Sequence, residues 1–348
     1  MEKVLKQRSI LTDEAIQAAL DGLCKPPGSL GRLEWLAAHL CRTQQTLMPL
    51  TRPRRAIVFA ADHGIVSQGV SQWPSSVTRS VVEIMVQKRT ASGVLADAFD
   101  CEYLVVDVGC LEPAHTANEN QGIIVQRRIA SGTCDMSREP AMSLSQFELA
   151  WEAGVEQVRA AANDGIQLLI GGEMGIGNST SASCLTAAIC GRTTIECVGR
   201  GAGLAYDRIE HKIQVVQRIL DRNRDFIDLG DWKNVGAAFG GFEIVALAGM
   251  FTEANRLQMT ILLDGFIATA GALLAFAIDP SIVHCMIAAH GSPEPGHRLA
   301  LEHLSLEPVL EWGMCLGEAS GALVALPLLD GAASIINRMA TLREVAGT

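Results

Sequence analysis

The first fifty residues show apolar side chains that recur every three or four positions. This spacing predicts two amphipathic helices, and Thr12 is placed to cap the first of them. The Pro- and Gly-rich residues 25–31 end the first helix and precede the second. The inward positions are Ile16, Ala19, Leu20 and Leu23 in the first helix, and Leu33, Leu36, Ala37 and Leu40 in the second. The pair predicts a small helical subdomain ahead of the main fold.

From residue 56 onward, short apolar runs of strand length alternate with helical stretches. This alternation favours an α/β fold with a mostly parallel sheet and helices on both faces. The candidate strands are residues 56–61, 103–108, 168–170, 259–263 and 283–289, with 123–125 as a further candidate. Residues 313–322 open a helix rich in Ala and Leu. Another helix from Ala332 onward is expected to pack back on the N-terminal pair.

Five of the predicted strands run directly into polar or glycine residues. These endings are residues 62–64, 107–109, 172–173, 264–265 and 290–292. In open parallel sheets, ligands bind beyond the carboxyl ends of the strands. Any one ending is also ordinary turn chemistry, but five together predict a binding site. For Asp62 and His63, a polar turn and a direct contact with a ligand stay open as alternatives.

The most informative ending follows the buried apolar run at residues 166–170. Three glycines surround Glu173, and residues 179–189 then have helical character. A strand, a glycine loop and a helix together bring backbone N–H groups and a positive helix end to an anion. The loop lacks both the ending of a P-loop and the glycine spacing of a dinucleotide site. A tight turn is the alternative, but a carboxylate repels phosphate, so Glu173 suggests contact with another part of a ligand.

Two further segments carry candidate chemistry. Residues 199–203 form a second glycine loop, and Lys212 lies on the helix that follows; lone helical lysines are mostly solvated, but this one is a candidate phosphate partner. Glu318 is flanked by small residues and therefore suits a snug, partly dry cavity. The alternative role for Glu318 is a first-turn carboxylate that interacts with the helix dipole.

Composition narrows the class of protein. A chain of 348 residues with 49% hydrophobic and 19% charged residues fits a globular enzyme with one large and one smaller domain. The net charge of -10 argues against general nucleic-acid binding. The ten cysteines include no Cys-x-x-Cys pair, and the N-terminus lacks an apolar signal core. Asp264 and Gly265 favour a strand, turn and helix over a membrane span at residues 261–278, so we expect a cytoplasmic protein.

Seven sequence blocks resemble the nicotinate-nucleotide–dimethylbenzimidazole phosphoribosyltransferase family. They are residues 25–34, 60–64 with 69–71, 172–178, 198–201, 264–266, 294–297 and 316–318, in family order from about residue 24 to 335. Three positions depart from the family pattern. Pro27 is more often Leu or Val, residues 318–321 are commonly Glu-Gly-Thr-Gly, and Ala202 is commonly Thr. These departures leave the shape of the base pocket open.

The resemblance implies a Rossmann-like large domain at residues 51–305 and a small helical domain built from residues 1–50 and 306–348. It also implies a homodimer that moves the 5-phosphoribosyl group of nicotinate mononucleotide onto 5,6-dimethylbenzimidazole, without metal or cofactor, and with neither nucleic acid nor membrane as partner. Glu318 is then the catalytic base, and Glu173 contacts the ribose or lies near the oxocarbenium-like centre. The glycine loops, the helix after the second loop and the strand endings supply the candidate substrate-binding residues, which are Gly175, Gly177, Asn178, Gly201, Gly203, Lys212, Asp264, His290 and Ser292.

The residues also leave two alternative functions open. An NAD dehydrogenase requires Gly-x-Gly-x-x-Gly after the first strand, where this chain has Asp62-His63-Gly64. A nucleotide-sensing or scaffold protein would keep the glycine loops but has no use for Glu318 in an apolar segment. The natural acceptor base is open among benzimidazoles, purines and phenolics.

Overall fold

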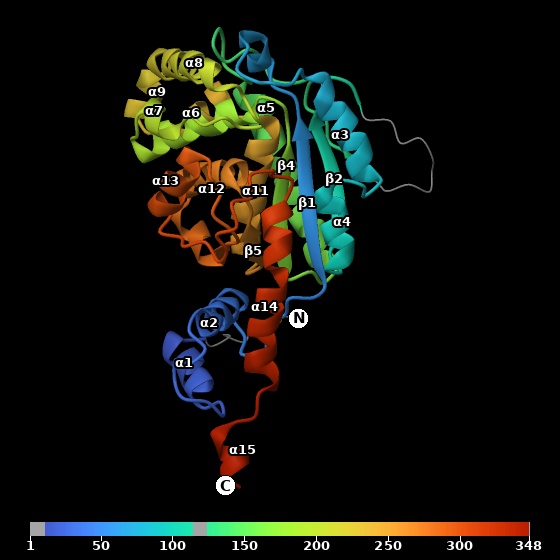
Figure 1. Cartoon of the computed structure of the whole chain (residues 1–348), viewed down its shortest axis with the longest axis vertical. Coiled ribbons are helices and arrows are strands. Elements are labelled where there is room, and N and C mark those ends of the chain that lie inside the picture. The colour runs from blue at the N-terminus through green and yellow to red at the C-terminus, as the bar shows by residue number, and fades with distance from the viewer. Residues whose placement is uncertain (1–10, 114–123, 348) are drawn as a thin grey trace, which may run out of the picture. The chain divides into compact units, whose positions relative to one another are not determined.

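The computed structural model describes residues 11–113 and 124–347, and the chain divides into two compact units (Figure 1). Unit 1 comprises Met1–Arg52 and Leu326–Thr348, and unit 2 comprises Pro53–Ala325. A small helical unit is therefore built from both chain ends. The domain boundaries at residues 50 and 305 stay a prediction.

Unit 2 contains a six-stranded sheet whose strands are all parallel. The strands are β1 (Arg54–Ala61), β2 (Glu102–Gly109), β3 (Ile124–Gln126), β4 (Leu168–Met174), β5 (Thr260–Leu263) and β6 (Met286–Ala288). Their order is β3-β2-β1-β4-β5-β6, so the chain builds outward on one side of β1 and then outward on the other. This is the Rossmann strand order, and the predicted fold class is confirmed. Of the predicted third strand, residue 123 lies outside the described residues.

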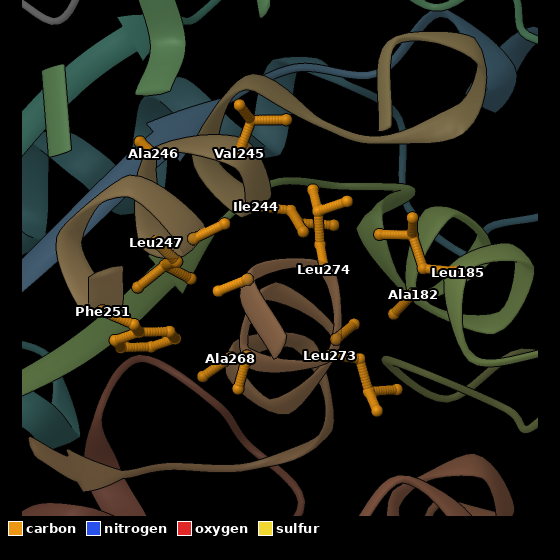
Figure 2. Packing of buried hydrophobic residues seen from close by; sticks show 14 of the residues in the cluster. Ala182, Leu185, Ile244, Val245, Ala246, Leu247, Phe251, Ala268, Leu273 and Leu274 are labelled. Atoms are coloured by element: carbon orange, nitrogen blue, oxygen red, sulfur yellow. The ribbon is translucent and has the colours of Figure 1, made fainter. Parts of the chain in front are cut away.

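Helices cover both faces of this sheet. Because side chains alternate along a strand, Phe59 of β1 joins one apolar cluster while Val58 joins the other. The smaller cluster lies under α3 (Ser76–Val86). The larger one includes α5 (Leu144–Asn163), α6 (Asn178–Cys190), α11 (Phe242–Arg256) and α12 (Phe266–Ile278). Figure 2 shows Leu247 and Phe251 of α11 beside side chains of α12 within this cluster.

The remaining elements of unit 2 connect these layers. They are η1 (Gly64–Gln68), α4 (Ala91–Ala98), α7 (Thr194–Cys197), η2 (Tyr206–Arg208), α8 (Ile209–Arg222), α9 (Arg224–Asp228), α10 (Trp232–Phe239), η3 (Pro280–Cys285) and α13 (Pro295–His303). The last predicted strand was too long, because Asp279 accepts a hydrogen bond from Ser281 N–H and starts η3 instead. Residues 261–278 form β5, a turn and α12, as predicted.

Unit 1 contains α1 (Asp13–Asp21), α2 (Arg32–Gln44) and α15 (Leu342–Ala346). Thr12 caps α1 through a hydrogen bond from Ala15 N–H, as the sequence predicts. A buried ion pair between Lys25 and Glu34, with an N–O distance of 2.8 Å, fixes the turn before α2. The hydroxyl of Thr51 donates to Asp330, so the two chain ends are joined by side-chain bonds as well as by packing.

The last long helix, α14 (Ser320–Arg338), runs from unit 2 into unit 1 without a break. The prediction of a separate helix starting at Ala332 was wrong. Leu323, Leu326 and Leu329 are buried at helical spacing, and this periodic face continues past Pro327, which does not end the helix. By length and composition α14 also passes as a membrane span, but half of the window is buried inside the protein, which is typical of a core helix.

Candidate active site

A cavity of about 230 Å³ lies at the carboxyl ends of β4, β5 and β6 in unit 2. Each of these strands contributes the residues that follow it: Gly175 after β4, Gly265 after β5 and His290 after β6. Residues 315–318, just before α14, and side chains of α3 also line the cavity, as do Trp73, Ser179, residues 201–202 and Glu294. Such a position is where open parallel sheets bind ligands.

Glu173 lies near the end of β4, paired with Phe59 of β1, and is almost fully buried. Its Oε2 accepts a hydrogen bond from the Nδ2 of Asn178, the first residue of α6. Burial, with the charges of Glu243 and Asp264, raises the pKa of Glu173 to about 8. At neutral pH this carboxyl is therefore mostly protonated, although it lines an open cavity.

Glu318 lies on a tight turn two residues before α14. Gly317, Glu318 and Ala319 have φ values of +83°, +61° and +67°, a left-handed conformation that is strained for the two non-glycine residues. The turn packs closely on β4: a β-carbon on Gly172 would lie 2.8 Å from the nitrogen of Ala319. Glu318 therefore precedes the first turn of α14. The sequence predicts a helix that already begins at residue 313 and includes Glu318.

Glu318 is 8% exposed and lines the cavity. Its Oε2 accepts a hydrogen bond of 3.2 Å from the hydroxyl of Ser92. Burial raises the pKa of Glu318, the Ser92 bond lowers it, and the charge of Asp264 raises it further. The site thus holds a desolvated carboxylate that is a better base than a solvated one.

The second glycine loop lies against two charged side chains. The N–H of Gly201 donates to Glu294 Oε1 at 2.9 Å, so a carboxylate already occupies that donor. Lys212 is fully buried, and its Nζ donates to Ser179 Oγ at 2.9 Å and to the Gly199 carbonyl at 3.1 Å. Burial lowers the pKa of Lys212 to about 8. The solvated-lysine alternative is therefore wrong.

His290 lies at the cavity wall after β6 and is 2% exposed. In the described part of the chain, neither of its ring nitrogens has a hydrogen-bond partner; Nε2 is 3.7 Å from Asp264 Oδ1. That Asp264 oxygen accepts from the N–H of Ala322, near the start of α14. Ser292 is fixed through its own N–H, which donates to Nδ1 of His297 at 2.9 Å.

The ends of β1 and β2 do not reach the cavity. His63 Nε2 is 2.7 Å from Glu243 Oε1, and its Nδ1 is 3.2 Å from Ser181 Oγ. Asp62 accepts from the N–H of Leu111. The contacts of His63 join the end of β1 to α6 and α11, and the bond of Asp62 joins it to the segment after β2; neither residue lines the cavity.

The phosphoribosyltransferase family model matches residues 7–346. The chain belongs to this family. The nicotinate-nucleotide–dimethylbenzimidazole phosphoribosyltransferases of Nitratidesulfovibrio vulgaris strain DP4 and Shewanella loihica are 39% and 40% identical, covering 95% and 96% of this chain and 92% and 96% of their own lengths. The crystal structure of CobT from Thermus thermophilus superimposes with a TM-score of 0.90 at 39% identity, covering 96% of this chain and 98% of that one. The resemblance in the seven blocks is confirmed.

For this phosphoribosyltransferase, most of the predicted site residues meet at one cavity. Those that line it are Glu173, Gly175, Asn178, Gly201, His290, Ser292 and Glu318. Gly177, Lys212 and Asp264 lie behind the lining, and Gly203 lies at an exposed position. Their roles toward substrate stay a prediction.

Several lining residues were not predicted as site residues. Glu294 and Leu316 lie within the recognised blocks, so the sequence held a signal for them. Ser179 directly follows the block at residues 172–178. Val77 and Val81 had no signal, because apolar residues on an amphipathic helix look the same whether they face a core or a cavity, and Trp73, in the segment before α3, had none either.

Proposed function

We propose that this phosphoribosyltransferase transfers the 5-phosphoribosyl group of nicotinate mononucleotide to 5,6-dimethylbenzimidazole, the substrates named in its relatives. The products are α-ribazole 5′-phosphate and nicotinate, for the lower ligand of cobalamin. The observation that carries the proposal is the buried Glu318 carboxylate, held on a strained turn at the wall of a cavity that Glu173 also lines. A sensing protein gains nothing from that strain.

The reaction balances with Glu318 as the base. One ring nitrogen of the acceptor forms a bond to C1′ of the ribose while the C1′–N bond to nicotinate breaks. The electron pair of the broken bond stays on the nicotinate nitrogen, which loses its positive charge. The other ring N–H of the acceptor gives its proton to Glu318, a step worth about 10²–10⁴-fold in rate. Attack opposite the leaving group converts a β bond to an α bond.

Glu173 serves the donor in this scheme. A carboxyl with a pKa of about 8 is protonated at neutral pH and donates a hydrogen bond, which suits a ribose hydroxyl. Asn178 fixes the other oxygen through its Nδ2. Glu173→Gln is expected to raise the donor KM at least as much as it lowers kcat.

The donor phosphate is best placed at the N-terminus of α6. There the positive end of the helix dipole meets the cavity, and Ser179 adds a hydroxyl backed by the Lys212 ammonium. Gly201 contributes less than the sequence suggested, because Glu294 already accepts from its N–H. The lining formed by Trp73, Val77 and Leu316 is apolar and suits a flat benzimidazole ring.

The proposal also includes a cytoplasmic homodimer that needs no cofactor and binds no nucleic acid. The family resemblance implies the dimer, and Trp73 and Leu316, which are exposed apolar side chains at the cavity, are accessible to a second copy of the chain. Light scattering of the purified protein is expected to give about twice the chain mass of 37.1 kDa.

A product screen tests the proposed function. The protein is incubated with nicotinate mononucleotide and a panel of benzimidazoles, purines and phenolics, and the products are identified by mass. We expect phosphoribosylated 5,6-dimethylbenzimidazole in the largest amount, and about 10²–10⁴-fold less of it with Glu318→Gln in the same time. Binding of the donor without any phosphoribosylated product would favour a sensing protein instead.

A further inference from the structure

A chain of hydroxyl groups lies behind Glu318. Ser92, in the first turn of α4, is fully buried, and its Oγ donates to Glu318 Oε2. The same Oγ is 2.8 Å from the Tyr103 hydroxyl on β2 and 3.0 Å from the Thr90 hydroxyl. None of these hydroxyl residues lines the cavity, so they reach the substrate only through Glu318.

The direction of the hydrogen bonds follows from proton counting. Ser92 has one hydroxyl proton, which it uses to donate a hydrogen bond to Glu318. Its oxygen therefore accepts hydrogen bonds from the hydroxyl groups of Tyr103 and Thr90. Burial raises the pKa of Tyr103 to about 12, so Tyr103 stays protonated and remains a donor. Thr90 is itself fixed, because it caps α4 and accepts from the N–H of Gly93.

The two oxygens of a carboxylate have a fixed geometry, so a hydrogen bond that holds one of them also fixes the position of the other. With Oε2 bound to Ser92, Oε1 remains for the acceptor at the cavity. We infer that Ser92, held by Tyr103 and Thr90, is a positioning residue that orients Glu318 for proton transfer from the acceptor base. This inference rests on the proposed function, since it assigns Ser92 a role in the same proton transfer.

The same bond has a consequence for pH dependence. A hydroxyl that donates to a carboxylate stabilises its charged form, so loss of the Ser92 hydroxyl raises the pKa of Glu318. Activity requires ionised Glu318, so the acid limb of the kcat profile moves to higher pH. The other titratable groups facing this turn are Glu173 on β4, Asp264 after β5, Tyr103 on β2 and His290 after β6.

Ser92→Ala tests the inference in the purified full-length enzyme. We expect kcat to fall about 10-fold and the acid limb to shift up by about one pH unit, as for loss of one hydrogen bond to a charged group. The donor KM should stay within about twofold. Ser92→Thr keeps the hydroxyl and should restore both kcat and the limb. Tyr103→Phe, which keeps the Ser92 bond but removes its donor, should have a smaller effect in the same direction.

Two comparisons separate positioning from a merely structural role. Thr252→Val, which removes a hydroxyl that donates to the Ala248 carbonyl far from the turn, should leave kcat and the pH profile unchanged. Ser92→Ala added to Glu318→Gln should lower kcat no further, because no base remains to orient. An equal loss in both backgrounds, or an unchanged acid limb in Ser92→Ala, overturns the inference. A wild-type enzyme that makes no phosphoribosylated product overturns the proposed function and this inference together.

Discussion

Two carboxyl groups at one cavity have different environments, and we propose different roles for them. Glu173 is surrounded by Glu243 and Asp264 as well as by apolar atoms, and it holds its proton to a pH of about 8. Burial raises the pKa of Glu318 as well, but the hydroxyl of Ser92 donates to its carboxylate and partly offsets the effects of burial and of the Asp264 charge. One residue type thus supplies a donor and a base in the same site, a division of roles known from acid–base enzymes.

Glu318→Gln is the sharpest change at this scale. The amide keeps the shape and can still accept from Ser92, but it takes no proton. We expect kcat with 5,6-dimethylbenzimidazole to fall about 10²–10⁴-fold with little change in the donor KM. An acceptor methylated on its second ring nitrogen has no proton to lose, and with it the loss should be much smaller. An equal loss with both acceptors would assign Glu318 to substrate positioning instead.

Glu173→Gln has an expected effect on stability that is separate from activity. The pKa of Glu173 lies at about 8 in the folded chain and near 4.5 in the unfolded chain, so the folded chain holds the extra proton between these pH values. The free energy of unfolding therefore falls as pH rises through this window, by at most about 1.4 kcal/mol per pH unit. Glutamine does not titrate.

Thermal unfolding between pH 5 and 8 measures this effect. The Tm of Glu173→Gln should rise relative to wild type as pH increases, whereas Glu14→Gln, at an exposed position on α1, should follow wild type in parallel. A constant Tm difference between Glu173→Gln and wild type across this range would show that Glu173 releases its proton near its ordinary pKa.

At the scale of elements, the two glycine loops serve α6 in different ways. Gly175 allows the β4–α6 loop to lie on β1, since a β-carbon there would lie 2.5 Å from the Ala61 carbonyl oxygen. Gly201 has a φ of +53°, and a β-carbon there would lie 2.5 Å from Ser179 Oγ, the group that Lys212 holds. The second loop therefore acts on the proposed phosphate site through Ser179.

Gly201→Ala tests this coupling between the loops. The methyl group displaces the Ser179 hydroxyl, so the donor KM should rise about 10-fold or more while kcat changes less. Gly191→Ala is the matched control, because Gly191 also has a positive φ of +62° but a β-carbon there meets nothing within 4 Å. The control should lose stability by about 1 kcal/mol without a change in donor KM. Equal KM changes in the two variants would place the phosphate elsewhere.

Lys212 links the phosphate site to pH. Its pKa of about 8 means that the ammonium loses its proton above that pH in the free enzyme. The kcat/KM for nicotinate mononucleotide should therefore fall as pH rises above about 8. Lys212→Met should lower kcat/KM at pH 7 and leave only the part of the alkaline limb that comes from deprotonation of Glu173. Nicotinate riboside, which has no phosphate, should be used poorly by both proteins; its efficient use by wild type would contradict the assignment.

The periodicity of the sequence predicts the helices and strands but not the residues that line the cavity. The six strands and helices such as α1 and α2 follow from apolar spacing, because burial imposes that spacing, although β6 is shorter than predicted and α14 is one helix where two were predicted. The turn at Glu318 does not follow from apolar spacing. Glu318 and Ala319 have positive φ values although neither is a glycine, so the sequence gives no sign of the left-handed conformation there. The buried state of Lys212 also escapes prediction, because its partners Ser179 and Gly199 come close only in three dimensions.

At the scale of the whole molecule, strand order determines which endings form the site. β1 and β4 are neighbours, but the side chains after β1 bond inward to α6 and α11, while those after β4, β5 and β6 surround the cavity. The sequence predicted five converging endings, and three of them converge. Segments 173–179, 264–292 and 315–318 are far apart along the chain and come together only in the folded protein.

The most direct test of phosphoribosyl transfer is the release of nicotinate from nicotinate mononucleotide, measured with and without 5,6-dimethylbenzimidazole in the presence of EDTA. We predict that nicotinate appears only when the acceptor is present, in a one-to-one ratio with α-ribazole 5′-phosphate, at a rate that EDTA does not change. Nicotinate release at the same rate without acceptor, or activity lost in EDTA and restored by magnesium, would contradict the account.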